Sequence, residues 1–350
     1  MPQPVRIGVI GAGAFTTRGT IPNFQGLPDV TVTAVANRSR ASAEKVAAQF
    51  GIPNVVDDFR NLITRSDVDA VFIGAPPYVH KEASLAALSA GKHVLCQVRM
   101  TLISEDAREM CAKADEARSR GLRTMLMPGD SFYRGAKYVS HLIESGYLGK
   151  LRHVQGFNMN DSLADIKAPQ RRGRDWATYG QFNALQVGLS YQVLAQWTGY
   201  ATNVMAQQTM YVTERPAGPD GPMIKNPYAD EVTIVSDTTS SAILMNLQNH
   251  AVRFAESRVE LYGDEGTVIY RAAGDVIQGA HLGDKGLHEL PIPPEFANPW
   301  RVEEEFIRLI RGEINEPQLS FKDGLLNQEY MEAAYRSAVE GRRIELELGQ

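Results

Sequence analysis

The sequence predicts an α/β protein whose first part is a doubly wound parallel sheet and whose second part carries a large, mostly antiparallel sheet. Short apolar strands and amphipathic helices alternate up to about residue 127, and closely spaced glycines follow the first strand. Beyond about residue 200, apolar residues recur with a period of two, which is typical of strands with one buried face. Because 350 residues exceed the usual size of one domain, we divide the chain into residues 1–127 and 128–350.

The first predicted strand is Val5–Ile10, and a glycine-rich turn follows it directly. Gly11 and Gly13 let the backbone turn sharply beside a pyrophosphate at a helix N-terminus. Thr16 stands where this fingerprint usually has a third glycine or an alanine. Two glycines alone are a weak signal, since ordinary strand-to-helix turns also use them. The alternation that follows them favours a dinucleotide site, in which Ala14 and Phe15 would also face the pyrophosphate.

The rest of the first part continues this alternation. Strands are predicted at residues 31–36, 68–75, 93–98 and 122–127, and helices at residues 43–50, 79–90 and 104–117. Right-handed crossovers between parallel strands give a Rossmann-type sheet with its ligand crevice at the carboxyl ends of the strands.

The second part has a different pattern of predicted helices and strands. Helices are predicted at residues 136–143, 182–197, 302–310 and 323–340, and extended runs at residues 204–212, 243–247 and 252–262. In the second extended run, Ile243, Met245 and Leu247 form the apolar face. Residues 215–228 are rich in proline and glycine and are predicted to form a long loop.

Composition excludes several classes of function. The net charge of −5 argues against non-specific binding of nucleic acid or of anionic membranes. No apolar run reaches the length of a membrane span and no secretory signal precedes the first strand, so we expect a cytoplasmic protein. Cys96 and Cys111 fall on apolar faces and are predicted to be buried thiols, and no metal-ligand spacing is found.

Seven ordered motifs extend over nearly the whole chain: GVIGAGAF, APPYVH, AGKHVLC, ESGYLGKLRHV, WTG, VELYGDEGTV and AYRSAVEGRRIEL. Together they resemble the Gfo/Idh/MocA family of nicotinamide-dependent sugar and polyol oxidoreductases. The resemblance implies a Rossmann domain followed by an α/β domain whose open sheet forms the substrate floor. It also implies a carbohydrate-like small-molecule substrate and a homodimer or homotetramer formed through that sheet.

The end of the second strand bears on the choice of cofactor. An acidic residue there normally binds the ribose hydroxyls of NAD and repels the 2′-phosphate of NADP. This chain has Asn37, Arg38 and Ser39 instead, a set that suits a phosphate, so NADP is favoured over NAD. A solvated arginine at a helix start is the alternative.

Further cofactor contacts follow from the resemblance. Pro76, Pro77 and His80 match the region that lies beside the nicotinamide, and Gln97 stands where the family has a glutamate near the ribose. His80 could equally be a helix-start histidine bonded to the backbone.

The usual acid/base residues are replaced. Val98 and Arg99 stand where the family has lysine and proline, and a valine can neither donate a proton nor carry charge. On the helix that carries the family histidine, the aligned residues are Gln186, Gly188, Ser190 and Val193, so the histidine and both aspartates are missing. An arginine and a proline common elsewhere in the family correspond to Ser131 and Arg134.

Other residues are therefore candidates for the proton transfer that hydride chemistry requires. Tyr179 and Tyr191 flank the altered helix motif and are our candidate catalytic residues, with packing as the alternative. Arg99, Arg174, Gln186 and Ser190 are predicted to line the substrate pocket, and the arginines of the segment that carries Arg174 suit a carboxylate or phosphate. A basic surface loop is the alternative for Arg174.

Three functional hypotheses remain open from the sequence. The first is an NAD(P)-dependent oxidoreductase with a non-standard acid/base set, in which His80 or a water held by Ser190 and Gln186 could also serve. The second is a lyase or epimerase that uses transient oxidation. The third is a non-catalytic accessory or sensor protein that keeps the cofactor fold, because several acid/base residues are missing together.

Overall fold

The computed structural model describes residues 4–128, 135–169, 180, 182, 185–218, 220–226, 228–297 and 301–348. Contacts divide the chain into two compact units, Met1–Gly129 with Trp300–Gln328, and Asp130–Pro299 with Glu329–Gln350. The sequence-based division gave every residue after 127 to the second domain. The stretch 300–328 returns to the first unit because its apolar side chains, such as Phe306 and Phe321, complete that unit's core.

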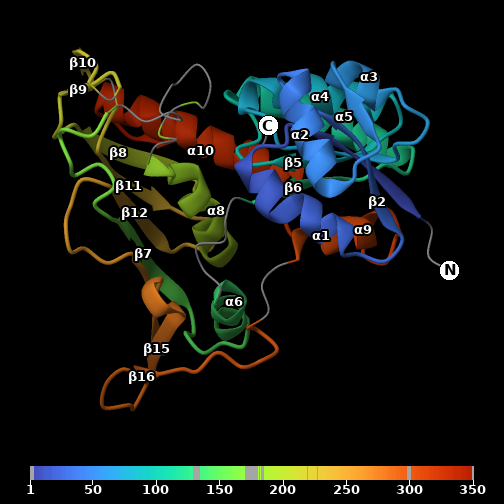
Figure 1. Ribbon diagram of the computed structural model, residues 1–350. Helices are drawn as coiled ribbons and strands as arrows, with labels where there is room; N and C mark the ends of the chain where they lie inside the picture. The colour runs from blue at the N-terminus through green and yellow to red at the C-terminus, as the bar shows by residue number, and fades with distance from the viewer. Residues whose placement is uncertain are drawn as a thin grey trace. The chain divides into compact units, whose positions relative to one another are not determined.

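The first unit is built on a parallel sheet (Figure 1). Its described strands are β1 (Val5–Ile10), β2 (Val30–Ala36), β3 (Asn54–Val56), β4 (Ala70–Ile73), β5 (His93–Gln97) and β6 (Thr124–Met127). They lie in the order β3-β2-β1-β4-β5-β6, and all neighbours are parallel. The Rossmann-type prediction is confirmed. The order reverses between β1 and β4, and at such a reversal doubly wound sheets bind ligands beyond the carboxyl ends of the strands.

Helices bury both faces of this sheet. They are a π-helical turn Thr16–Thr20 that continues as α1 (Ile21–Gln25), then α2 (Arg40–Phe50), α3 (Phe59–Ile63), α4 (Pro77–Ser89), α5 (Ser104–Ser119), α9 (Val302–Ile310) and the start of α10 (Phe321–Glu340). One core cluster joins the sheet to α1, α2 and α9, and another joins it to α3, α4, α5 and α10. Burial on both faces explains why these strands are almost wholly apolar.

The second unit contains a larger sheet (Figure 1). Its described strands are β7 (Leu151–Met159), β8 (Asn203–Thr209), β11 (Glu231–Asp237), β12 (Ile243–Asn249), β13 (Arg258–Gly263), β14 (Gly266–Arg271), β15 (Val276–His281), β16 (His288–Glu289) and β17 (Ile344–Glu345). The order is β16-β15-β14-β13-β7-β12-β11-β8-β17, and only β7 and β12 are parallel neighbours within it. The prediction of a mostly antiparallel sheet is confirmed.

One face of this sheet is covered and the other is open. The covered face packs against α8 (Val187–Thr198), with α6 (Ala136–Glu144) and the second half of α10 in the same core cluster. Helix α8 lies so close to β7 that a Cβ on Gly156 would come within 2.7 Å of Leu194. On the open face, Met205, Val235 and Ile243 are exposed despite being apolar.

Three local predictions for the second unit are corrected. The predicted loop 215–228 contains a hairpin of β9 (Glu214–Pro216) and β10 (Met223–Lys225). The helix predicted from residue 182 begins at Val187, because the residue before it has a left-handed backbone with a φ of +58°. Strand β12 turns Leu244, Asn246 and Gln248 inward, opposite to the predicted face, because α8 offers a polar partner on that side.

Three further features bear on function. No described helix is long and apolar enough to cross a membrane. Over the residues that the structure describes, no group of three or more His, Cys, Asp or Glu side chains could hold a metal ion. Cys96 is buried in β5, and the half-buried Cys111 of α5 donates its thiol to the carbonyl of Phe321 (3.2 Å).

Candidate functional site

The turn after β1 is shaped by two glycines with different requirements. Gly11 has a φ of +85°, and its N–H donates to the carbonyl of Ala36 at the end of β2 (2.8 Å). A Cβ on Gly11 would lie 2.5 Å from the backbone nitrogen of Ala75, whereas a Cβ on Gly13 would meet no heavy atom within 4 Å. The fold therefore requires Gly11, and Gly13 leaves open space beside a helix start whose first N–H groups lack intrahelical partners. Helix starts of this kind are typical binding sites for phosphate groups.

The third fingerprint position is occupied by a buried threonine. Ala14 and Phe15 are the first helical residues, and the hydroxyl of Thr16 behind them donates to the carbonyl of Gly11 (3.2 Å). A Cβ on Gly74, just after β4, would lie 2.8 Å from that hydroxyl oxygen. The close approach that the third glycine usually permits is therefore provided by Gly74 from the opposite side.

Of the three residues after β2, Asn37 and Ser39 are held by hydrogen bonds of their side chains, and Arg38 is not. Asn37 accepts the N–H of Ala12 through its Oδ1 (2.6 Å) and so braces the glycine turn. Ser39 is the N-cap of α2, and its side chain accepts the N–H of Ser42. Arg38 is exposed, and no hydrogen bond or ion pair joins it to another described residue. It is the cation available for a ligand at this strand end.

Pro76 and Pro77 start α4 beside the glycine turn, with Pro76 extended and Pro77 as the first helical residue. His80, one turn later, is 1% exposed. Its Nε2 lies 2.6 Å from the carbonyl oxygen of Ala75, and its Nδ1 lies 3.0 Å from the carbonyl oxygen of Arg99. Desolvation lowers the pKa of His80, although these carbonyls oppose the shift. The imidazole thus links the loops that follow β4 and β5 at the carboxyl edge of the sheet. His80 therefore matches the alternative of a helix-start histidine bonded to the backbone.

The segment after β5 differs most from the expected chemistry. Gln97 ends the strand half-buried, and the peptide between Val98 and Arg99 is cis. Val98 packs against the core cluster that holds α4 and α5, so it contributes apolar contact only. Burial lowers the pKa of the half-buried Arg99 guanidinium to about 9. A desolvated cation of this kind favours an anionic group nearby.

Within the first unit, the predicted cofactor residues therefore gather at one edge of the sheet. They come from the ends of four strands: Gly11, Gly13, Ala14 and Phe15 after β1, Asn37, Arg38 and Ser39 after β2, Pro76, Pro77 and His80 after β4, and Gln97 at the end of β5. This edge is the one that doubly wound sheets use for ligands.

The predicted substrate residues of the second unit lie on and before α8. Ser190 is 5% exposed, and its hydroxyl donates to the Oδ1 of Asn246 in β12 (3.3 Å). Its N–H donates to the carbonyl of Gln186, which is half-buried and precedes the helix (3.0 Å). Ser190 and Gln186 are thus one helical turn apart on the same unit, and Ser190 is directed towards the sheet.

Tyr191 is a core residue, and the structure does not support it as a proton donor. It is 1% exposed, its hydroxyl oxygen accepts the N–H of Ala201 (2.9 Å), and burial raises its pKa well above the usual value. Its ring stacks on Tyr330, with centroids 3.5 Å apart. Consecutive helical residues point about 100° apart, so Tyr191 does not share the direction of Ser190.

Four sequence-predicted positions lie outside the described residues. They are the candidate catalytic residue Tyr179, the predicted pocket residue Arg174, and Ser131 and Arg134.

A buried polar cluster under α8 was missed by sequence reasoning. Asn246 and Gln248 are fully buried in β12, and the Nε2 of Gln248 donates to the Oδ1 of Asn246 (2.6 Å). Tyr330 from α10 is buried beside them, and burial raises its pKa. The available signal was the alternation of two amides with apolar residues in one strand.

Comparisons with known proteins agree with this architecture. Residues 5–123 match the Gfo/Idh/MocA family model, described as an oxidoreductase family with an NAD-binding Rossmann fold. The dTDP-3,4-didehydro-2,6-dideoxy-alpha-D-glucose 3-reductase of Streptomyces antibioticus is 38% identical over 157 residues, which cover 44% of this chain and 46% of that protein. The match thus spans just under half the length of that relative.

Solved structures are similar over almost the whole chain. An oxidoreductase domain protein from Kribbella flavida superposes with a TM-score of 0.86 and 22% identity, covering 98% of this chain and 99% of that one. Levoglucosan dehydrogenase in complex with NADH and L-sorbose gives a TM-score of 0.83 and 21% identity, covering 98% and 99%. At these identities the likeness concerns the fold. The fold, the motifs and the family match over residues 5–123 agree, and together they support membership of the Gfo/Idh/MocA family of oxidoreductases.

Proposed function

We propose that the protein binds a nicotinamide dinucleotide at the carboxyl edge of its six-stranded parallel sheet and oxidises or reduces a sugar-like or polyol substrate. The observation that carries this proposal is the glycine turn, where Gly13 leaves open space and Asn37 braces the backbone. Gly13, Ala14 and Phe15 would hold the pyrophosphate, and Pro76 and Gln97 would face the nicotinamide ribose. When bound, the dinucleotide supplies or accepts a hydride.

The substrate class rests on the relatives. One is named as a reductase of a dTDP-linked keto sugar, and a structural neighbour was solved with NADH and L-sorbose. A panel of sugars, polyols and their keto forms, followed by nicotinamide absorbance, tests the proposal. Turnover with at least one member supports it, and binding of the dinucleotide without turnover of any member favours the second candidate below.

The finer proposal is a preference for NADP over NAD. Arg38 is the exposed cation without a described partner at the end of β2, and Asn37 adds no negative charge there. A guanidinium and a neutral amide favour a 2′-phosphate, whereas a carboxylate would favour the ribose hydroxyls.

Replacing Arg38 by alanine is expected to weaken NADPH binding about tenfold and to leave NADH binding unchanged. Asn37→Asp keeps an acceptor for the N–H of Ala12 but adds a charge, so it should shift the preference towards NADH. Arg40→Ala is the matched control, because Arg40 is already paired with Asp57 and Glu44. Fluorescence titration of each variant checks this; an unchanged NADPH-to-NADH ratio in Arg38→Ala would contradict the preference.

The proton must then move through a non-standard group. Val98 is apolar, Tyr191 lies in the core and both ring nitrogens of His80 face carbonyls. Tyr179 and a water held by Ser190 and Gln186 remain our candidates, with Arg99 and Arg174 orienting an acidic or phosphorylated substrate.

The second candidate is a non-catalytic protein that binds the dinucleotide as an accessory or sensor. Two observations favour this candidate. The hydroxyl of Ser190 donates to Asn246, and Val98 packs against the core. In the oxidoreductase reading, Tyr179→Phe or Ser190→Ala lowers kcat and changes its pH profile without changing NADPH affinity. If turnover exists and neither substitution alters kcat, both proton-transfer candidates are wrong.

The open face of the nine-stranded sheet supports the proposal of a homodimer or homotetramer. Val235→Glu is expected to shift the protein to monomers, because it places a charge amid the exposed apolar side chains of Met205 and Ile243. Met223→Glu is the control, since Met223 is also an exposed apolar residue but lies on the β9–β10 hairpin. Sedimentation velocity checks both variants, and a Val235→Glu variant that keeps the wild-type assembly would contradict this interface.

A further inference from the structure

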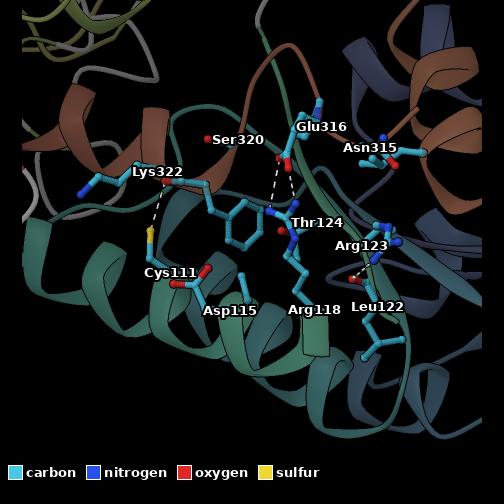
Figure 2. A pocket seen from close by; sticks show the side chains of 14 residues that line it. Cys111, Asp115, Arg118, Leu122, Arg123, Thr124, Asn315, Glu316, Ser320 and Lys322 are labelled. Carbon is cyan, nitrogen blue, oxygen red and sulfur yellow. Dashed lines mark hydrogen bonds and ion pairs between the residues drawn. The ribbon is translucent and has the colours of Figure 1, made fainter. Parts of the chain in front are cut away.

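A cavity of about 430 Å³ lies in the first unit, away from the carboxyl edge of the sheet (Figure 2). Helix α5, the start of β6, and the segment from α9 to α10 form its walls. The buried side chains of Ala114, Leu309 and Phe321 give it apolar surface, and Arg118, Arg123 and Glu316 bring charge. Its volume falls within the range of about 300–1,000 Å³ that is usual for small-molecule sites.

Arg123 is the most informative residue of this cavity. Its Nε is buried without a hydrogen-bond partner, and its Nη1 reaches only the neighbouring carbonyl of Leu122 (3.3 Å). No ion pair among the described residues includes Arg123. A buried cationic nitrogen without a partner is costly, and a bound anion would satisfy it.

The strand beside Arg123 adds backbone groups to the same cavity. In β6, the carbonyl of Arg123 accepts the N–H of Val94 in β5, and the carbonyl of Met127 accepts the N–H of Val98 just after β5. The N–H of Leu126 points away from β5 and donates to the carbonyl of Leu319 (2.9 Å). Because β6 is an edge strand and alternate residues point the same way, the N–H and C=O of Thr124 also point outward. Thr124 lines the cavity, so a ligand can meet a donor and an acceptor there.

The second arginine, Arg118, is paired with Glu316 through both of its Nη atoms. Figure 2 shows Arg118 and Glu316 pointing towards one another, and they form an ion pair in which both side chains are more than half exposed. Exposed pairs of this kind contribute little to stability. Because the pair is exposed, an incoming anion can compete with Glu316 for Arg118.

We propose that this cavity is a second ligand site, for a small carboxylate with a flat apolar body. The carboxylate would bind Arg123 and the N–H of Thr124, while the body would lie on the surface formed by Leu309 and Phe321. The site goes beyond the proposed redox function, because it lies near the amino end of β6 and shares none of the residues proposed to hold the dinucleotide.

Calorimetric titration of the full chain with benzoate tests the site, with benzamide as the neutral isostere and inorganic phosphate as a second anion. Benzoate is expected to bind at least about tenfold more tightly than benzamide. Arg123→Gln should remove about that factor. Arg120→Gln, the same change outside the cavity, should leave benzoate affinity unchanged.

A second variant keeps the test decisive if Arg123→Gln fails to fold. Glu316→Gln releases Arg118 and is expected to tighten benzoate binding several-fold, with an unchanged melting temperature. Equal affinities for benzoate and benzamide, or equal effects of the two arginine substitutions, would overturn the proposal. Displacement of benzoate by NADPH, or a preference for phosphate, would overturn it as well.

Discussion

Replacing Gly13 by alanine is expected to weaken dinucleotide binding at least about tenfold while leaving the free energy of unfolding within about 0.5 kcal/mol of wild type. The backbone at Gly13 does not have a positive φ, and a Cβ there meets no heavy atom within 4 Å, so the fold tolerates the methyl group. The same methyl would fill the space proposed for the pyrophosphate. Fluorescence titration with NADPH and urea denaturation measure the two quantities.

Gly11→Ala is the matched comparison, because it changes the same turn for a different reason. Its φ of +85° and the 2.5 Å approach of a Cβ to Ala75 predict a destabilisation of about 2–5 kcal/mol. If Gly13→Ala loses as much stability as Gly11→Ala, the open space at Gly13 is not what the geometry indicates. If Gly13→Ala keeps full NADPH affinity, the pyrophosphate does not bind there.

The second large effect is expected at Arg215. This side chain is almost fully buried, its guanidinium lies 3.5 Å from the buried carboxylate of Asp230, and it donates to the carbonyls of Leu163 (2.6 Å) and Asp165 (2.8 Å). Removing one partner of a buried ion pair leaves the other uncompensated. Arg215→Met should therefore destabilise the protein by about 3–5 kcal/mol in chemical denaturation.

Two variants control this prediction. Lys225→Met removes a charge from the exposed side of the same hairpin and should change stability by no more than about 0.5 kcal/mol. Arg215→Met combined with Asp230→Asn should recover part of the loss, because Asn can still accept the N–H groups of Tyr211 or Val212. A double variant as unstable as the single one would show that the ion pair is not the source of the effect.

The same substitution has a functional consequence. The carbonyls that Arg215 holds belong to the segment that leads directly to residues 170–179, where Arg174 and Tyr179 are predicted to act. Arg215→Met should therefore raise KM for the substrate in any variant that still turns over, whereas Lys225→Met should not.

The first unit was predictable because its signals are local. Val5–Ile10 is apolar throughout, and Gly11 follows it at the spacing of a dinucleotide turn. The three-residue strand β3 was missed, since so short a run carries no period. The sequence also could not predict that Gly74 allows the close approach of Thr16, because the two residues lie far apart in the chain.

The second unit shows where the sequence is ambiguous. Strand β12 alternates apolar residues with amides, and the apolar set looked like the buried one. The structure buries Asn246 and Gln248 instead, because Ser190 supplies a hydrogen bond across the interface with α8. Tyr191 was a reasonable proton donor by its position in the motif, but its contacts with Ala201 and Tyr330 arise only when α8 and α10 pack together.

The identity of the proton donor stays a prediction about Tyr179, Ser190 and Gln186. Binding of the dinucleotide at the carboxyl edge of the parallel sheet can be tested directly. Calorimetric titration of the full chain with NADPH and with NADH is the most direct measurement. Saturable binding of both, with NADPH the tighter ligand, is expected from the open space at Gly13 and the cation at Arg38. No binding of either dinucleotide at millimolar concentration would contradict a nicotinamide site at this edge.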